Sequence, residues 1–176
     1  AQARLPLSMM RLSTAVETTT TLALAGHELL IGTLERLLSI RGIGDDKVML
    51  LLGFTGSDAA VKFARKEALS ITGNHSGIHV GRTFGSQWHK SRFRTPYLRN
   101  TLWEAGYAVD TLETAVSWDQ VNPLLRAIES AIKGAAAPLG ERVHTFTHLS
   151  HFYPTGASIY TTYLFRLADN PDETLH

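Results

Sequence analysis

The sequence has 176 residues with a formal net charge of +1, and it contains 44% hydrophobic residues, 19% charged residues and no cysteine. This length and composition predict a single domain with one sizeable core, because domains usually hold roughly 100–200 residues. They exclude a globally basic nucleic-acid coat, a disulfide framework, thiolate chemistry and, since no apolar run reaches ~18–20 residues, a membrane-spanning helix.

The first part of the chain shows alternating strand and helix signals. We expect an edge strand over residues 5–12, a connection over 14–21, a helix over 22–39, a buried strand over 47–54, and a helix from Ser57 to Gly73. Ser57 is the expected N-cap of the last of these elements. Its apolar side consists of small and aliphatic residues: Val61, Ala64, Ala68 and Leu69.

Glycines then recur at every fourth position, at Gly73, Gly77, Gly81 and Gly85. Because glycine supplies the positive φ that many turns need, the pattern favours short strands and tight turns. A backbone that a ligand approaches closely is the alternative. The order of these glycines matches neither the GxGxxG nor the GxxxxGK[ST] phosphate-binding pattern.

A basic, aromatic stretch follows. Between Glu67 and Glu104 there is no acidic residue, and basic side chains stand close to large aromatic ones there: Arg82, Lys90, Arg92, Arg94 and Arg99 beside Trp88, Phe93, Tyr97 and Trp103. These residues could bind phosphates and stacked bases, or they could form a solvated basic face whose tryptophans pack into the core. Both interpretations remain open on composition alone.

Within this stretch, Thr95 and Pro96 predict the start of a helix that ends at Gly106. Arg99 would then lie near the positive end of the helix dipole, which disfavours a cation by up to about 1 kcal/mol at an exposed position. An anionic ligand, a carboxylate or exposure to water would compensate for this cost.

The last part of the chain predicts a strand over 107–116, a helix over 118–134, a loop, and a hairpin of strands 143–152 and 157–167. The apolar face of the helix consists of Val121, Leu124, Leu125, Ile128 and Ile132, with Ser117 and Gln120 in capping-box positions. Tyr160 lies on the more polar face of the second hairpin strand. Together the elements predict an α+β fold, a ferredoxin-like antiparallel sheet with helices packed on one face.

Two common kinds of catalytic centre are not predicted. His144 and His148 are four residues apart on a strand and therefore roughly 13 Å apart, too far to share one metal ion. No GxSxG nucleophile elbow is present either. The residues by themselves thus indicate an α+β domain with one basic, aromatic-rich site and no assigned metal ligand.

Three segments in order carry a resemblance to a known family. They are RFRTPYLRN (92–100), GYAVDTLETAVSWDQV (106–121) and HLSHFYPTGASIYTTYLF (148–165), and RLSTAVET (11–18) adds to them. These segments resemble the C-terminal, substrate-side domain of FAD-linked oxidases of the vanillyl-alcohol oxidase superfamily, and within it the branch of alkyldihydroxyacetonephosphate synthases (alkylglycerone-phosphate synthases). The resemblance covers most of the chain.

The resemblance implies roles for two residues by position. Arg99 matches the arginine that handles the charged part of the substrate, and Tyr160 matches a tyrosine that transfers protons or binds substrate near the flavin. In the synthase branch, the acyl group of acyl-dihydroxyacetone phosphate is exchanged for a long-chain alcohol to give an ether lipid, with the flavin as nucleophile and no net redox change. Other relatives oxidise hydroxy acids by hydride transfer to FAD.

Four further residues are expected to bind substrate: Arg94, His148, Ser150 and His151. Pairing of Phe152 with Ser158 would place His148 and Ser150 on the face of Tyr160, and a shifted register would place His151 there. The implied cofactor is FAD, held mostly by another domain of the same polypeptide, so no cofactor-binding residue is assigned here. The expected partners are this FAD domain and an anionic small-molecule or lipid-like substrate, not nucleic acid, and a homodimer is left open.

The expected organisation is one domain over residues 1–176, a fragment of a larger flavoenzyme that is inactive alone. The resemblance implies that the FAD-binding domain lies outside it, and we expect a C-terminal extension because Asn170 and Pro171 predict a helix that begins where the sequence stops. The expected location is cytoplasmic, with membrane association through a lipid substrate. Two alternatives remain: the cap domain of an FAD-linked hydroxy-acid oxidase or dehydrogenase, and a stand-alone ferredoxin-like domain that binds a ligand or nucleic acid.

Overall fold

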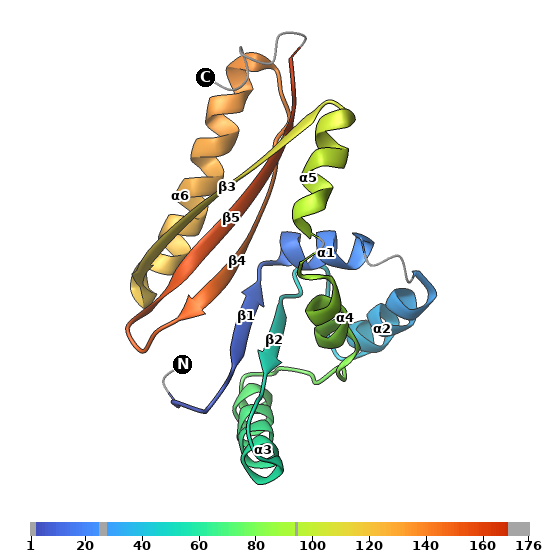
Figure 1. The fold of residues 1–176 in the computed structure, drawn as a ribbon, viewed down its shortest axis with the longest axis vertical. Helices are drawn as coiled ribbons and strands as arrows, with labels where there is room; N and C mark the ends of the chain where they lie inside the picture. The colour runs from blue at the N-terminus through green and yellow to red at the C-terminus, as the bar shows by residue number, and fades with distance from the viewer. Residues whose placement is uncertain (1–2, 25–27, 94, 169–176) are drawn as a thin grey trace.

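The fold is α+β and is built on one antiparallel sheet (Figure 1). The computed structural model describes residues 3–24, 28–93 and 95–168, and for residues 28, 30, 95 and 96 it describes the backbone alone. Five strands form the sheet in the order β2-β1-β4-β5-β3. Their bounds are β1 (Met9–Ser13), β2 (Met49–Gly53), β3 (Tyr107–Ser117), β4 (His144–Phe152) and β5 (Gly156–Arg166). The expected α+β class with an antiparallel sheet is confirmed.

Six α-helices connect the strands within the described residues. They are α1 (Ala15–Leu24), α2 (Glu28–Ile40), α3 (Asp58–Asn74), α4 (Thr83–Ser91), α5 (Thr95–Glu104) and α6 (Trp118–Ala136), and a 3₁₀ turn (Ala137–Leu139) follows α6. In Figure 1, α6 runs along one side of the long strands β3, β5 and β4, while α5 lies on the other side. None of the helices in the described ranges is both long and apolar enough to cross a membrane.

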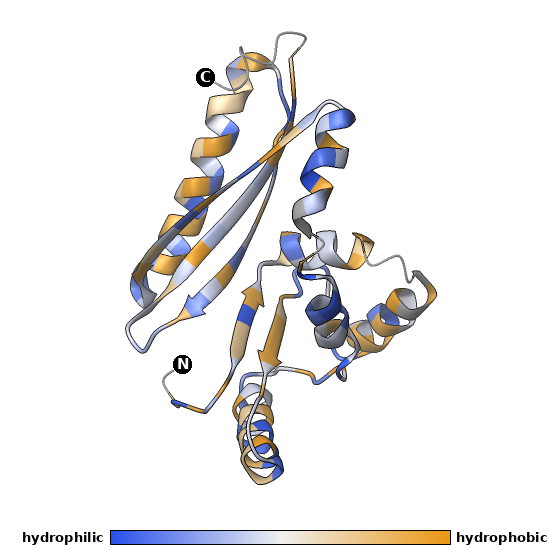
Figure 2. Ribbon diagram, in the orientation of Figure 1, coloured by the Kyte–Doolittle hydropathy of each residue, from blue (hydrophilic) through white to orange (hydrophobic). Residues whose placement is uncertain are grey.

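The hydrophobic core lies between α6 and the long strands. Its buried members are Val121, Leu149, Ala157 and Ile159, and the apolar stripe predicted for α6 packs around them. Figure 2 shows the alternation of apolar and polar residues along α6 that produces this stripe. At the hairpin turn, a Cβ at Gly156 would lie 1.9 Å from the carbonyl oxygen of Val116, so only glycine lets β3 approach β5 here.

The connection predicted over residues 14–21 is wrong, because these residues form most of α1. The predicted helix over 22–39 is correspondingly two helices, α1 and α2. β-branched threonines lower helix propensity only weakly, and tertiary contacts override that preference. Here the hydroxyl of Thr18 donates to the carbonyl of Thr14 and accepts from the amide of Met49, at 2.8 and 3.0 Å.

The predicted positions of the first two strands in the sheet are also wrong. β1 was expected at the edge, but it lies between β2 and β4. β2 was expected to be buried, but it is the edge strand, and Leu50 on it is 38% exposed while Leu51 is buried. A short apolar run predicts a strand but not which strands pair with it, because strand order depends on residues far along the chain.

The glycine-rich segment contains turns but no strand in its described residues, so the predicted short strands are wrong there. α3 continues through Gly73, and Gly85 lies inside α4. The turn roles hold at Gly77, whose amide donates to the carbonyl of Thr72 at 2.8 Å, and at Gly81, whose φ is +92°.

The remaining elements agree with expectation. Ser57 caps α3 by accepting from the amide of Ala60, and Gly106 (φ +81°) follows α5. The β4–β5 hairpin and α6 match their predicted ranges closely. Ser117 is the N-cap of α6 but makes no side-chain capping hydrogen bond, so the predicted capping box does not form. The helix signal at Asn170 and Pro171 lies outside the described residues.

Candidate functional site

The register of the β4–β5 hairpin separates a core face from a polar face. Leu149 pairs with Ile159 on the face that packs against α6, and His148 pairs directly with Tyr160 on the opposite face. Of the registers left open by the sequence, the structure has neither Phe152 opposite Ser158 nor an unbroken ladder: Phe152 pairs with Ala157, and an irregularity lies between Leu149 and Phe152. Such bulges shift the register by one residue and turn side chains to a different direction.

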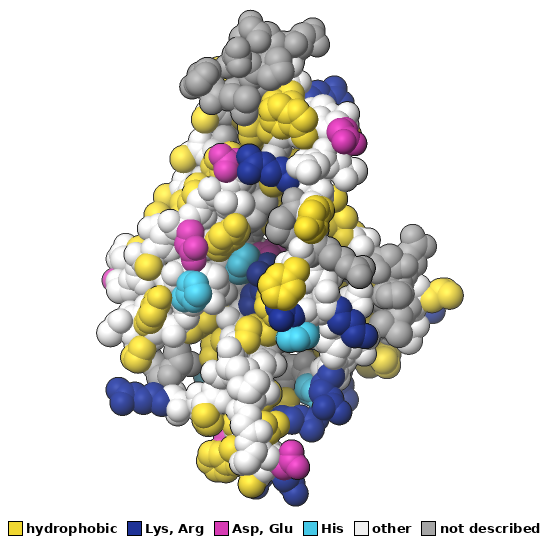
Figure 3. All heavy atoms as spheres, in the orientation of Figure 1, with side chains coloured by type: hydrophobic (Ala, Val, Ile, Leu, Met, Phe, Trp, Pro, Cys, Tyr) yellow, Lys and Arg dark blue, Asp and Glu magenta, His cyan; other side chains and the backbone are white. Residues whose placement is uncertain are grey.

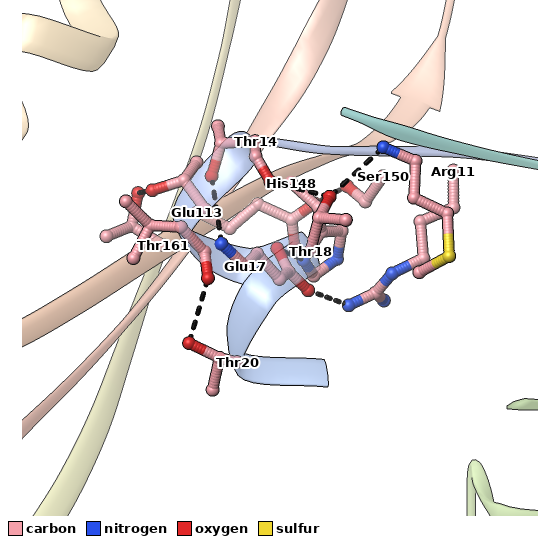
Figure 4. A network of polar contacts seen from close by, with 12 residues as sticks. Arg11, Thr14, Glu17, Thr18, Thr20, Glu113, His148, Ser150 and Thr161 are labelled. Carbon is pink, nitrogen blue, oxygen red and sulfur yellow. Dashed lines mark hydrogen bonds and ion pairs between the residues drawn. The ribbon is translucent and has the colours of Figure 1, made fainter. Parts of the chain in front are cut away.

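A charged network lies on the polar face (Figure 4). Glu17 of α1 is 2% exposed, and its Oε1 accepts from the guanidinium of Arg11 on β1. Its Oε2 accepts from Nδ1 of His148 at 3.1 Å, and His148 is itself 8% exposed. A carboxylate so deeply buried needs such partners, since an unpaired charge there is strongly destabilising.

Tyr160 lies next to this network. Its ring stacks on the ring of His148 with the centroids 5.0 Å apart and 28° between the planes. Its other cross-strand neighbour is Glu113 of β3. Tyr160 therefore lies between a histidine and an acid on the two neighbouring strands, at a partly buried position.

The local sequence explains why Glu17 reaches the strands. Thr14 precedes α1 and caps it, with its hydroxyl 3.4 Å from the amide of Glu17. In the usual capping box the glutamate would bond back to the amide of Thr14. That amide instead donates to the carbonyl of Thr147 on β4 at 2.9 Å, so the side chain of Glu17 is available to Arg11 and His148.

Ser150 and His151 continue the site toward solvent. The hydroxyl of Ser150 donates to Oε1 of Glu113 at 2.7 Å. His151 Nε2 lies 3.9 Å from the same oxygen, and the His151 side chain is 65% exposed. Figure 3 shows histidine, acidic and basic side chains close together on this face of the molecule. Glu113 thus links both residues to the strand that flanks Tyr160.

Arg99 lies on α5 and is exposed. Within the described parts of the chain, no hydrogen bond or ion pair of its guanidinium is recorded, so it is available to an anion. Arg94 lies outside the described residues. The structure therefore places Ser150 and His151 at Glu113 and stacks His148 on Tyr160, and within the described residues it records no contact between these residues and Arg99.

Three residues of the network were not among the predicted site residues: Arg11, Glu17 and Glu113. The spacing Thr14-x-x-Glu17 is a capping-box signal that could have indicated both α1 and an acidic residue at its start. Glu113 alternates with apolar residues on β3, which places it away from α6. No local pattern, however, indicates that Glu17 lies beside His148.

The site is buried at Glu17 and His148 and becomes exposed toward His151. Two hollows in the described surface lie elsewhere, one along α2 near Glu35 and Lys47, the other beside α1 near Asp46 and His144. Across the residues with described placement, no group of three or more histidines and acids is suited to a metal ion.

Comparison with protein families gives one match that covers nearly the whole chain. The family described as FAD linked oxidases, C-terminal domain, matches residues 1–175. Among curated proteins, an alkyldihydroxyacetonephosphate synthase of Dictyostelium discoideum is 25% identical over 122 residues, which are 69% of this chain and 20% of that protein. The enzyme of the same name from Trypanosoma brucei brucei is 24% identical over 135 residues, which are 76% of this chain and 22% of that protein.

Solved structures give the same neighbours. One structure of an alkyldihydroxyacetonephosphate synthase superposes with a TM-score of 0.80 at 22% identity, covering 98% of this chain and 32% of that chain. A second, in another crystal form, gives a TM-score of 0.75 at 24% identity over 93% of this chain and 31% of that chain. The chain spans about a fifth of the length of the two curated relatives. The similarity to the solved structures shows a shared fold.

Proposed function

The chain belongs to the family of FAD linked oxidase C-terminal domains, and on that basis we propose that it forms the substrate-side part of an FAD-dependent enzyme. The finer proposal is acyl-to-alkyl exchange on acyl-dihydroxyacetone phosphate, the reaction of the ether-lipid branch that the sequence resembles. The observation that carries the proposal is the placement of Tyr160, the residue matched to the tyrosine near the flavin. It lies on a polar sheet face, between His148 and Glu113.

FAD is the cofactor that the family implies for full-length proteins. The polar face fits a role beside it, because the helix α6 covers the opposite face of β4 and β5 and leaves Tyr160 only partly buried. When bound, FAD would supply the nucleophilic or hydride-accepting centre. We expect another domain of the polypeptide to hold most of it.

The residues of this chain would then have two roles, substrate binding and proton transfer. Arg99 would bind the phosphate or carboxylate of the substrate, since it is exposed, has no recorded partner in the described chain and lies in an acid-free stretch. The hydroxyl of Tyr160 would hold or move a proton at a substrate oxygen. Ser150 and His151, linked through Glu113, would line the entrance to the site.

The test uses the full-length protein that contains this chain. Purified protein is supplied with acyl-dihydroxyacetone phosphate and a fatty alcohol, and the ether product is measured. A parallel assay offers D-hydroxy acids with an artificial electron acceptor. Ether formation supports the finer proposal. Oxidation of a hydroxy acid without ether keeps the flavoenzyme role and removes the synthase assignment, and the absence of both products overturns the proposal.

Two substitutions assign the roles. Arg99→Lys should lower kcat/KM about tenfold, mainly through a higher KM, because lysine loses the bidentate geometry of a guanidinium. Arg126→Lys, on the exposed side of α6, is the matched control, and its kcat/KM should stay within about twofold of the wild type.

Tyr160→Phe should lower kcat about 100-fold, the usual scale for losing a proton-transfer group. Full activity of Tyr160→Phe would remove Tyr160 from the chemistry.

A further inference from the structure

We propose that His148 and Glu17 form a positioning pair for Tyr160, in which Glu17 fixes the imidazole ring and the ring fixes the phenol. The proposal rests on the proposed function, because it assigns a task to residues around the proposed catalytic tyrosine. Neither the family match nor the names of the relatives assign a role to Glu17 or His148.

The first step is the contact between the two rings. His148 and Tyr160 are direct cross-strand partners, and their rings stack at 5.0 Å with 28° between the planes. Aromatic χ2 torsions are broad, so a phenol on an open sheet face could otherwise rotate between several directions. A ring that stacks on one side narrows this choice and directs the hydroxyl.

The second step is what holds the histidine. An ionised carboxylate can only accept hydrogen bonds, so the 3.1 Å contact places a proton on Nδ1 of His148. This bond sets both the tautomer and the rotation of the ring, as carboxylates do for histidines in many active sites. Nε2, which has no recorded hydrogen bond among the described residues, is then left for a substrate.

The third step is the cost of placing Glu17 there. It is 2% exposed, and stability alone would be served at least as well by an apolar residue of similar volume. Its other oxygen is occupied by Arg11, so the carboxylate is fixed from two sides. The network therefore runs from Arg11 on β1 through Glu17 on α1 to His148 on β4 (Figure 4). There the imidazole stacks on the ring of Tyr160.

The test is a double-mutant cycle in the full-length protein. His148→Phe keeps an aromatic ring but loses the bond to Glu17, and it should lower kcat about tenfold with KM within about twofold, as expected for misplacing a reacting group. In a Tyr160→Phe background, the same substitution should cause no further loss, since the pair acts through the phenol hydroxyl. An equal loss in both backgrounds, or no loss in either, would overturn the proposal.

Glu17→Gln is the second variant, for the case that His148→Phe does not fold. It preserves shape and should lower kcat about threefold, because the amide still accepts one hydrogen bond but no longer carries charge. The matched control is Thr161→Val, which removes the buried 2.9 Å hydrogen bond to Thr147 on the core face. It should lower Tm while leaving kcat unchanged. A comparable fall in kcat for the control would show general destabilisation and overturn the positioning role.

A measurement without turnover separates this proposal from the proposed function. With ring-labelled tyrosine, the NMR signals of Tyr160 should shift or broaden in Glu17→Gln and stay unchanged in Thr161→Val. If the wild type forms neither product, the proposed function fails while this result still decides the pair. If Tyr160 signals are unchanged in Glu17→Gln, the positioning pair fails whatever the wild-type activity is.

Discussion

The two faces of the β4–β5 hairpin use the same strands for opposite purposes. The face toward α6 buries Leu149, Ala157 and Ile159, of which the last two are 0% exposed. The other face carries His148 and Tyr160 next to a buried carboxylate. The comparison shows that a strand alternation of period two can place the stabilising and the proposed chemical residues at adjacent positions.

The two faces also differ in what holds them. The core face depends on apolar area removed from water, which needs no particular geometry beyond close packing. The polar face depends on directional contacts, because Glu17 is tolerated only with Arg11 and His148 in place. Substitutions on the two faces should therefore have separable effects on stability and on activity.

The largest effect on stability is expected at Ile159. Ile159→Ala should lower the free energy of unfolding by about 3–4 kcal/mol, because it leaves a cavity between α6 and the sheet. Chemical denaturation measures the change. Leu139→Ala, at a residue that is 58% exposed, should stay within about 0.5 kcal/mol. Equal losses in the two variants would contradict the assignment of the core to this face.

A smaller loss is expected at the ion pair of the polar face. Arg11→Ala should cost about 2 kcal/mol, less than a fully buried pair, since the Arg11 side chain is 24% exposed. Lys133→Ala breaks the exposed i,i+4 pair with Glu129 and should cost under about 0.5 kcal/mol. Thermal unfolding of the two variants compares them. If Lys133→Ala lowers the stability as much as Arg11→Ala does, burial is not the reason why the Arg11–Glu17 ion pair stabilises the fold.

The smallest effect is a pH dependence on the core side. Burial, and next the carboxylate of Asp110, raises the pKa of Tyr163 above its ordinary value of 10.0. The folded protein thus keeps this proton when the unfolded chain loses it. The resulting contribution to stability is complete below pH 10.0 and is lost as pH rises through the raised pKa of the folded state.

Tyr163→Phe should remove this contribution. Unfolding midpoints measured at about pH 9 and about pH 11 should differ less in the variant than in the wild type. Tyrosinate absorbance of the folded wild type should show one tyrosine titrating late, and that signal should be missing from the variant. A wild type and variant with the same pH dependence would contradict the raised pKa.

Several elements could be predicted because their signals are local. The apolar stripe of α6, the YPTG turn of the hairpin and the Ser57 cap each depend on residues a few positions apart. The faces of β5 follow in the same way, since Ile159 and Thr161 alternate with Tyr160. These predictions hold because the tertiary contacts of these residues agree with their local preferences.

The errors occurred where distant contacts outweigh local preference. α1 is rich in threonine, and its hydroxyls are used by residues far along the chain: Thr18 by Met49, and Thr20 by His144 at 2.9 Å. The sequence left the hairpin register open between His148 and His151, because the bulge between Leu149 and Phe152 has no clear sequence signal. Only the observed register shows that His148 is the direct cross-strand partner of Tyr160.

The sequence by itself determined the α+β class, the hairpin with its two faces, the helix that begins at Thr95 and the family resemblance that selects Arg99 and Tyr160. Only the tertiary structure decided that β1 is an interior strand, that Glu17 lies beside His148, and that His148 stacks on Tyr160. The physical reason is range: periodicity and caps act over a few residues, whereas Glu17 and His148 are 131 positions apart and meet only when the sheet forms.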